Sequence, residues 1–199
     1  TFLAILWWLI PLLLLGRYSP PFLHWIESAS FTTSITDPTT VLRGANHWLA
    51  YLGSASAWRA GWMLATQPVL VLATGVVAAA GMAGLAMRSL PHRSFLVGAA
   101  VAGAVLVGLG HTGVMSGLGS EQIQAFLDGT GAPVRNVHKF DLVLRLPLTV
   151  AFCHLLATIW PAQRRPLWRP VTTVALIGAL ILTWWPALSG QLTRGRSYT

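Results

Sequence analysis

Long apolar runs separated by polar stretches dominate the pattern of this chain. Five such runs can be drawn, at 2–15, 63–87, 95–115, 142–160 and 171–188. A helix needs about 20 mostly apolar residues to cross a bilayer, and all but the first run come close to that length. The pattern therefore predicts an all-α fold, a polytopic bundle of about five transmembrane helices whose first helix is truncated.

The composition supports a membrane protein. Hydrophobic residues make up 54% of the chain and charged residues only 9%, whereas a soluble domain carries about 25% charged residues. The chain starts at Thr1, and no basic segment precedes the first apolar run as it does in a signal peptide. We expect residues 1–199 to be a partial membrane core within a larger polypeptide.

The loops between the apolar runs differ in charge. The short loops 88–94 and 161–170 contain arginines and no acidic residue, while the acidic residues lie in or beside the longer loops 17–62 and 116–141. The positive-inside rule places arginine-rich loops in the cytoplasm, so we predict two inner short loops and two outer long loops. This topology explains much of the net charge of +8, and no basic stripe with interleaved aromatic residues indicates a nucleic-acid partner.

The first outer loop contains the signals of a helix at the membrane surface. Asp37 followed by Pro38 is a favourable helix start, and the apolar spacing predicts a helix that continues to Leu52 and stops at Gly53. Arg43 then lies on the polar face, as in helices that lie in the membrane interface.

Glu27 and Arg43 each have two interpretations. Glu27 has apolar neighbours and no cation close in sequence, so it is a candidate functional carboxylate. Arg43 and His47 are candidates for binding an anionic substrate. The alternative is that Arg43 and His47 contact only lipid headgroups. Tryptophans such as Trp48 are common at the headgroup level of a membrane.

The second outer loop predicts a short helix followed by a charged cluster. Ser120 is expected to cap a helix over 121–128 that stops at Gly129, with a buried side formed by Ile123, Phe126 and Leu127. Six polar or charged residues then lead into the apolar run at 142–160, namely Arg135, Asn136, His138, Lys139, Asp141 and Arg145.

This cluster predicts an anion site at the membrane surface. Charged groups beside a membrane span are costly to desolvate, which favours function over a requirement of the fold. Arginine, histidine and lysine offer donors to a phosphate. In the alternative interpretation, Asp141 caps the next helix and pairs with Arg145, and Arg135 and Lys139 extend towards the headgroups. That alternative leaves His138 and its neighbour Asn136 without a role.

Other residue patterns predict packing. The glycines within the apolar runs are expected to allow close helix packing, at Gly81, Gly84, Gly98, Gly103 and Gly108. The single cysteine, Cys153, excludes an internal disulfide and a cysteine-pair metal site. His138 and Asp141 supply only two ligands, so we expect no metal site.

Several motifs resemble the actinobacterial, mycobacterial-type arabinofuranosyltransferase D family. They are WWLIPLLLLGRYSPPFL at 7–23, IESA at 26–29, VLRG at 41–44, RNVHKFD at 135–141 and RLPL at 145–148. The resemblance covers nearly the whole chain. It implies part of a GT-C type membrane glycosyltransferase of the plasma membrane, with its site on the extracytoplasmic side.

The resemblance also implies a reaction. Enzymes of this family transfer arabinofuranose from decaprenyl-phosphoryl-arabinose to cell-wall arabinan with inversion, forming α(1→3) branches. The expected partners are the polyprenyl-phosphate lipid, the arabinan acceptor, the membrane and the rest of the same polypeptide. The lipid-linked sugar is a substrate, and no cofactor is expected in this part. The competing class is a polytopic transporter or lipid-handling scaffold that binds an anionic lipid without chemistry.

The resemblance also implies roles for most residues of the charged cluster. Arg135, His138 and Lys139 are expected to stabilise the charge that develops on the leaving phosphate. Asn136 would orient these groups, and Asp141 would hold the cations in place.

The catalytic base is expected upstream of Thr1, so the fragment alone is predicted to be inactive. Glu27 is the candidate base within the chain, and Glu27 and Arg43 would line the other wall of the site. The chain departs from the family pattern at His24, where an acidic residue is usual, and at Leu142, where proline is usual.

Overall fold

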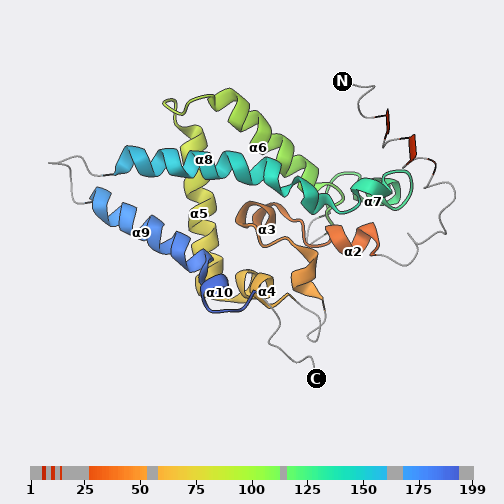
Figure 1. The fold of residues 1–199 in the computed structure, drawn as a ribbon, viewed down its shortest axis with the longest axis horizontal. Helices are drawn as coiled ribbons and strands as arrows, with labels where there is room; N and C mark the ends of the chain where they lie inside the picture. The colour runs from red at the N-terminus through yellow and green to blue at the C-terminus, as the bar shows by residue number, and fades with distance from the viewer. Residues whose placement is uncertain are drawn as a thin grey trace.

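The computed structural model describes residues 6–7, 10–11, 14, 27–52, 58–112, 116–160 and 168–192. Throughout these residues the regular structure is helical, which confirms the predicted all-α class. Most of the expected first span 2–15 and most of the short loop 161–170 lie outside the described residues. The elements in chain order are α2 (Ala29–Thr33), α3 (Pro38–Arg43), η2 (Trp48–Tyr51), α4 (Arg59–Thr66), α5 (Pro68–Ala86), α6 (Arg93–Gly108), α7 (Ser120–Asp128), η3 (Ala132–Val134), η4 (Val137–Phe140), α8 (Asp141–Ile159), α9 (Trp168–Thr183) and α10 (Trp185–Leu188) (Figure 1).

Two of the described helical segments are long and apolar enough to cross a membrane, Pro68–Ala86 and Val137–Ile159. The helices Arg93–Gly108 and Trp168–Thr183 are apolar but shorter. The apolar run at 63–87 is divided at Gln67, because a proline favours the first turn of a new helix. The membrane-type helical architecture is therefore supported, while the count of five spans stays a prediction.

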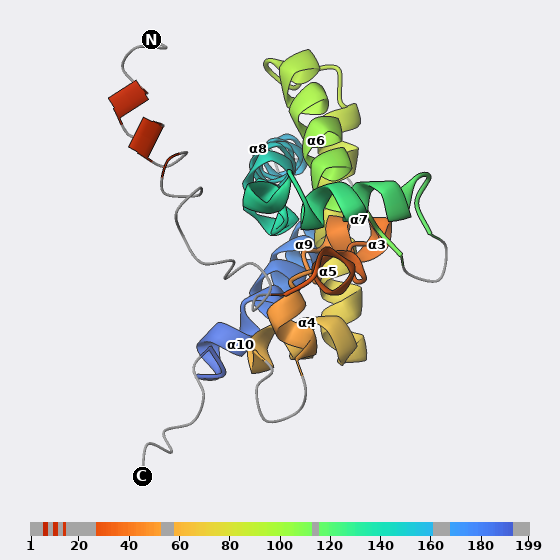
Figure 2. The same cartoon turned by 90° about the vertical axis from the view of Figure 1, so that its right-hand side faces the viewer.

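The helix α8 lies at the centre of the fold and contacts α5, α6 and α9. It runs across α5 in Figure 1 and is seen nearly end-on in Figure 2, so the two helices cross steeply. Neighbouring membrane helices more often cross at about 20°. Small residues allow the close crossing: a Cβ atom at Gly84 would overlap the backbone of Ala151, and one at Gly103 of α6 would lie 2.5 Å from the backbone nitrogen of Leu144.

The predicted packing role of the glycines is therefore confirmed at some positions only. Gly81 also fits the prediction, because a Cβ atom there would lie 3.0 Å from the carbonyl oxygen of Leu148. Among the described residues, an added Cβ atom at Gly98 would have nothing within 4 Å, and one at Gly108 would have its nearest neighbour 3.8 Å away. Within this part of the chain, these two glycines of α6 do not approach another helix backbone.

The main apolar core lies between α3, α5, α6 and α8. Val41, Leu85, Leu96, Leu144 and Leu148 belong to this cluster and are buried. Because Val41 comes from the loop before the long helices, the core attaches that loop to them. This attachment places the polar side chains around α3 close to the start of α8.

The structure corrects the predicted helix 38–52. Its start is as expected, since the Asp37 carboxylate accepts hydrogen bonds from the backbone of Thr39 and Thr40. Burial alone would raise the pKa of Asp37, but hydrogen bonds from these two threonines lower it below its usual value. The helix ends at Arg43, however, because Gly44 adopts a left-handed conformation with φ of 77°.

The structure also corrects the predicted helix 121–128. Gly129 ends α7 as predicted, but Gly119 precedes the helix and Ser120 is its first helical residue. Leu127 is buried as expected, whereas Phe126 is 54% exposed. The Phe126 ring lies against the backbone of Gly131 instead of entering the core.

Candidate functional site

An apolar cavity of about 380 Å³ lies where α3, α4, α5, α8 and α9 meet. Its walls are mostly aliphatic and aromatic, with Val77, Phe152 and Leu180 among the lining residues. Two cationic side chains, Arg43 and Arg145, also line it. Ligand pockets commonly combine an apolar wall with a few polar groups that orient the ligand. This cavity therefore suits a molecule with an apolar body and an anionic end.

Arg43 is held beside the cavity by two neighbouring helices. Its Nε donates to Thr74 Oγ1 at 3.0 Å, and its Nη2 donates to the carbonyl oxygen of Leu64 at 2.7 Å. A guanidinium has five N–H groups, so these two bonds leave three for other acceptors. No carboxylate among the described residues forms an ion pair with Arg43.

Arg145 is fixed by the end of α3. Its Nη1 donates to the carbonyl oxygen of Leu42 at 2.6 Å, and its Nη2 donates to that of Val41. The last carbonyls of a helix lack partners within the helix and carry its partial negative charge, so a cation is favourable there. Arg145 Nη2 also lies 3.8 Å from Asp141 Oδ1, which confirms the predicted pair.

The charges beside the cavity do not cancel. Arg43 and Arg145 are two cations, and Asp141 supplies one carboxylate to the second of them. One positive charge therefore remains in a partly buried, mostly apolar setting. Such a charge is costly unless an anion accompanies it.

Asn46 and His138 form a buried polar pair beside Asp141. The Nε2 of His138 lies 3.3 Å from the carbonyl oxygen of Thr32, an acceptor, so Nε2 carries the hydrogen. His138 Nδ1 is then an acceptor, and the amide nitrogen of Asn46 donates to it at 3.2 Å. The same amide nitrogen lies 3.5 Å from Asp141 Oδ1. Both contacts fix the orientation of the Asn46 amide.

His47 stacks on this pair. Its ring centroid lies 5.0 Å from that of His138, with an interplanar angle of 23°. Burial lowers the pKa of His47, although the nearby Asp141 carboxylate raises it. A neutral His47 avoids charge repulsion within the stack. Its Nδ1 accepts a hydrogen bond from the backbone of Leu49 at 3.3 Å.

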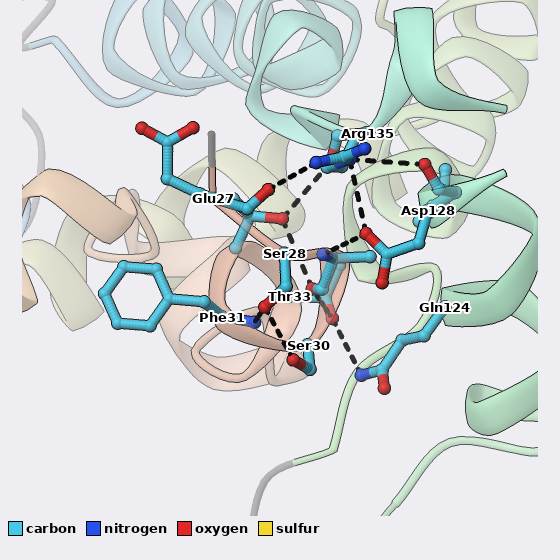
Figure 3. Close-up of polar contacts among 11 residues, drawn as sticks. Glu27, Ser28, Ser30, Phe31, Thr33, Gln124, Asp128 and Arg135 are labelled. Atoms are coloured by element: carbon cyan, nitrogen blue, oxygen red, sulfur yellow. Dashed lines mark hydrogen bonds and ion pairs between the residues drawn. The ribbon is translucent and has the colours of Figure 1, made fainter. Parts of the chain in front are cut away.

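Arg135, by contrast, joins the segment that follows α7 to the segment that precedes α2. Its Nη1 donates to the backbone carbonyl of Glu27 at 2.7 Å, and its Nε donates to that of Leu127 at 3.3 Å. It also forms an ion pair with Asp128, at 3.3 Å between Nε and Oδ1. The Asp128 carboxylate in turn accepts a hydrogen bond from the backbone of Ala29 (Figure 3). Arg135 is 6% exposed, so these contacts bury most of its guanidinium.

The other predicted site residues lie near this junction. The Glu27 side chain is exposed and points away from Arg135 in Figure 3, although its backbone carbonyl accepts from that arginine. Lys139 is exposed, and its ammonium donates to the carbonyl of Pro133 at 3.2 Å. Asn136 is half-buried, and its Oδ1 has no hydrogen-bond partner among the described residues. Within those residues, no group of three side chains is arranged to hold a metal ion.

Of the predicted site residues, the structure brings Arg43 to the cavity and places Asp141 next to Arg145. The sequence places Arg145 in the charged cluster but predicts for it only the pairing with Asp141, and it predicts no role for Asn46. An arginine inside an apolar helix is costly, and this signal could have identified Arg145. No local signal identifies Asn46, because its partners are more than ninety positions away.

Comparison with known proteins agrees with a membrane-type helical fold. Residues 1–199 match the family described as "Alpha-(1->3)-arabinofuranosyltransferase, N-terminal GT-C domain". A relative from Mycolicibacterium smegmatis, named alpha-(1->3)-arabinofuranosyltransferase, is 49% identical over 79% of this chain. A relative of the same name from Mycobacterium tuberculosis is 41% identical over 83% of this chain. No solved structure matches the chain.

The helical fold and the family match define a domain of a GT-C glycosyltransferase, a class of integral membrane enzymes. The aligned parts amount to only 11% and 12% of the two relatives, so the chain spans a small part of their length. The chain belongs to the alpha-(1->3)-arabinofuranosyltransferase family, as its motifs predicted.

Proposed function

We propose that this chain holds the lipid-linked donor in a membrane arabinofuranosyltransferase. The enzyme would transfer arabinofuranose from decaprenyl-phosphoryl-arabinose to cell-wall arabinan with inversion, forming α(1→3) branches on the extracytoplasmic side. The observation that carries the proposal is the apolar cavity bordered by Arg43 and Arg145. A polyprenyl phosphodiester combines the same two properties, a long apolar chain and an anion.

The charge balance supports this donor. A phosphodiester carries one negative charge, which complements the one positive charge left by Arg43, Arg145 and Asp141. When the sugar is transferred, the bond between its anomeric carbon and the phosphate oxygen breaks, and that oxygen keeps the electron pair. The departing polyprenyl phosphate is more negative than the donor, since the second pKa of a phosphate monoester is about 6. Fixed guanidinium groups therefore stabilise the leaving group more than the substrate.

The phosphate contact is assigned here to Arg43 and Arg145 in place of Arg135, His138 and Lys139. Arg135 is 6% exposed and lies outside the cavity lining, and so does His138, whose two ring nitrogens are both hydrogen-bonded. Lys139 is exposed outside the cavity lining. In this proposal these three residues shape the outer loops.

The proton balance requires a further group. An acceptor hydroxyl attacks the anomeric carbon and gives its proton to a base, which we place in the part of the polypeptide upstream of residue 1. Glu27 stays the candidate within the chain, since its carboxylate is exposed. The competing transporter or lipid-handling function fits the cavity equally well, but membership of a transferase family favours chemistry.

The test replaces the two arginines in the full-length enzyme and measures kcat and KM for the donor. A hydrogen bond to a charged group is worth about 1.5–3 kcal/mol, so Arg43→Ala should lower kcat/KM for the donor by about 10–150-fold. Arg43→Lys keeps the charge without the planar fork and should be intermediate. The matched control is Arg88→Ala, an exposed arginine in the turn between α5 and α6.

Arg145→Ala should have a similar effect, but this variant also weakens the end of α3, so Arg43 provides the cleaner test. Unchanged donor kinetics in Arg43→Ala would refute the assignment. If polyprenyl-phosphate binding fell while transfer stayed normal, the cavity would be a lipid-handling site separate from the chemistry.

A further inference from the structure

A row of aromatic rings crosses the first outer loop. The rings of Phe31 and Trp48 meet edge to face at 6.0 Å, and Trp48 is followed by His47 at 6.3 Å and an interplanar angle of 21°. Trp58 meets His47 edge to face at 5.8 Å. Phe31 is 41% exposed and Trp58 is 38% exposed, so the row reaches the surface at both ends. Figure 3 shows the Phe31 ring pointing away from the polar junction around Arg135.

Two polar groups in and beside this row lack partners. The indole Nε1 of Trp48 and the Oδ1 of Asn46 are buried and make no hydrogen bond among the described residues. Asn46 itself is 1% exposed. Buried polar groups are hydrogen-bonded in the great majority of cases, and each exception calls for an explanation.

The chemistry of these two groups is complementary. Asn46 cannot flip its amide, because the flip would set its oxygen against the Nδ1 lone pair of His138 and the carboxylate of Asp141. Its free group is therefore an acceptor, while the indole N–H of Trp48 is only a donor. A hydroxyl group can donate to the first and accept from the second.

The aromatic faces narrow the choice of ligand. An aromatic face carries partial negative charge, so it attracts the weakly positive C–H groups of a sugar ring. A sugar also supplies several hydroxyl groups on a rigid frame. The row therefore has the composition of a carbohydrate site, with stacking surfaces and hydroxyl partners side by side.

The row also adjoins the cavity of the proposed donor site. Asn46 contacts Asp141, and Asp141 pairs with Arg145, which lines the cavity. Asn46 and Asp141 would thus link a glycan on the row to the arginine that meets the lipid phosphate. We propose that Phe31, Trp48 and Trp58, together with Asn46, bind the acceptor glycan and direct its hydroxyl towards the donor. This inference rests on the proposed function for the identity of the glycan, but the row itself requires only carbohydrate binding.

The first experiment measures binding without the donor, so that it does not depend on the transfer reaction. The full-length enzyme in detergent is titrated with a soluble arabinofuranose oligosaccharide, and tryptophan fluorescence reports binding. Trp48→Phe keeps a ring but removes the N–H donor, and the loss of one neutral hydrogen bond should weaken binding about 5-fold. The control is Trp62→Phe in α4, because Trp62 is an exposed tryptophan that meets Tyr51 outside the row.

The second experiment separates the two substrates by steady-state kinetics. Trp48→Phe and Phe31→Ala should raise KM for the acceptor and leave KM for the donor unchanged, whereas Arg43→Ala should do the reverse. If the aromatic variants leave oligosaccharide binding and acceptor KM unchanged, the inference is wrong. If they instead reduce association with anionic-lipid vesicles, the row is a membrane anchor, which also overturns it. If Arg43→Ala leaves the donor kinetics unchanged while Trp48→Phe reduces oligosaccharide binding, only the donor assignment is rejected.

Discussion

Replacement of Arg135 distinguishes a structural cation from a substrate-binding one. Arg135→Ala removes the donors to the Glu27 and Leu127 carbonyls and the ion pair with Asp128. Hydrogen bonds from a charged group are worth about 1.5–3 kcal/mol each. Because Asp128 is 41% exposed at its side chain, water partly replaces its lost partner. We therefore expect a loss of about 2–4 kcal/mol in the local stability of α2 and α7.

Asp128→Asn should have a much smaller effect. The amide keeps an oxygen that can accept the hydrogen bond from the Ala29 backbone, and only the charge is lost. An ion pair with an exposed partner contributes about 0–1 kcal/mol. The double variant should then resemble Arg135→Ala alone, with a coupling energy of about 1 kcal/mol or less.

Hydrogen–deuterium exchange of the full-length enzyme in detergent measures these differences segment by segment. Amides of α2 and α7 should exchange about 30- to 1,000-fold faster in Arg135→Ala, and less than about 10-fold faster in Asp128→Asn. Exchange in α5 should stay unchanged. Unchanged exchange in Arg135→Ala combined with reduced transfer would refute the structural role and restore the phosphate contact predicted from the sequence.

Two further predictions concern the helices. A leucine at Gly84 would overlap the backbone of Ala151 and should lower the stability of the membrane domain by about 1–3 kcal/mol. The control Gly98→Leu, with open space around it among the described residues, should be nearly neutral. Equal losses of the two variants in a melting assay would contradict the close crossing of α5 and α8. Single cysteines introduced at Ser94 and Thr130, both exposed positions, should react with an impermeant reagent from opposite sides of the membrane. Labelling of both cysteines from outside intact cells would reject the predicted topology.

Local signals in the sequence predicted local structure. Asp37 and Pro38 start α3 as expected, Gly129 ends α7, and Asp141 pairs with Arg145 one turn later. Each of these features depends on residues within about four positions of one another. The spacing of these residues in the sequence is therefore enough to predict such features.

Features that depend on distant contacts were not predictable in the same way. The last carbonyls of α3, whose final helical residue is Arg43, are bound by the guanidinium of Arg145 from α8. The hydrogen bond from Arg135 to the Glu27 carbonyl and the stack of His47 on His138 likewise join segments that are close only in the folded chain. The apolar spacing of 38–52 predicts one long helix, because the spacing indicates which residues are buried and not where the helix ends.

The anchoring of Arg145 by two backbone carbonyls has a consequence for ligand binding. A free arginine side chain loses about 2 kcal/mol of rotamer entropy when it is fixed. Here folding has already restricted that side chain, so an anion in the cavity would meet a preorganised cation and lose less entropy on binding. The affinity for the anion then becomes linked to the integrity of α3, and any change that unwinds this six-residue helix weakens the site without touching the ligand.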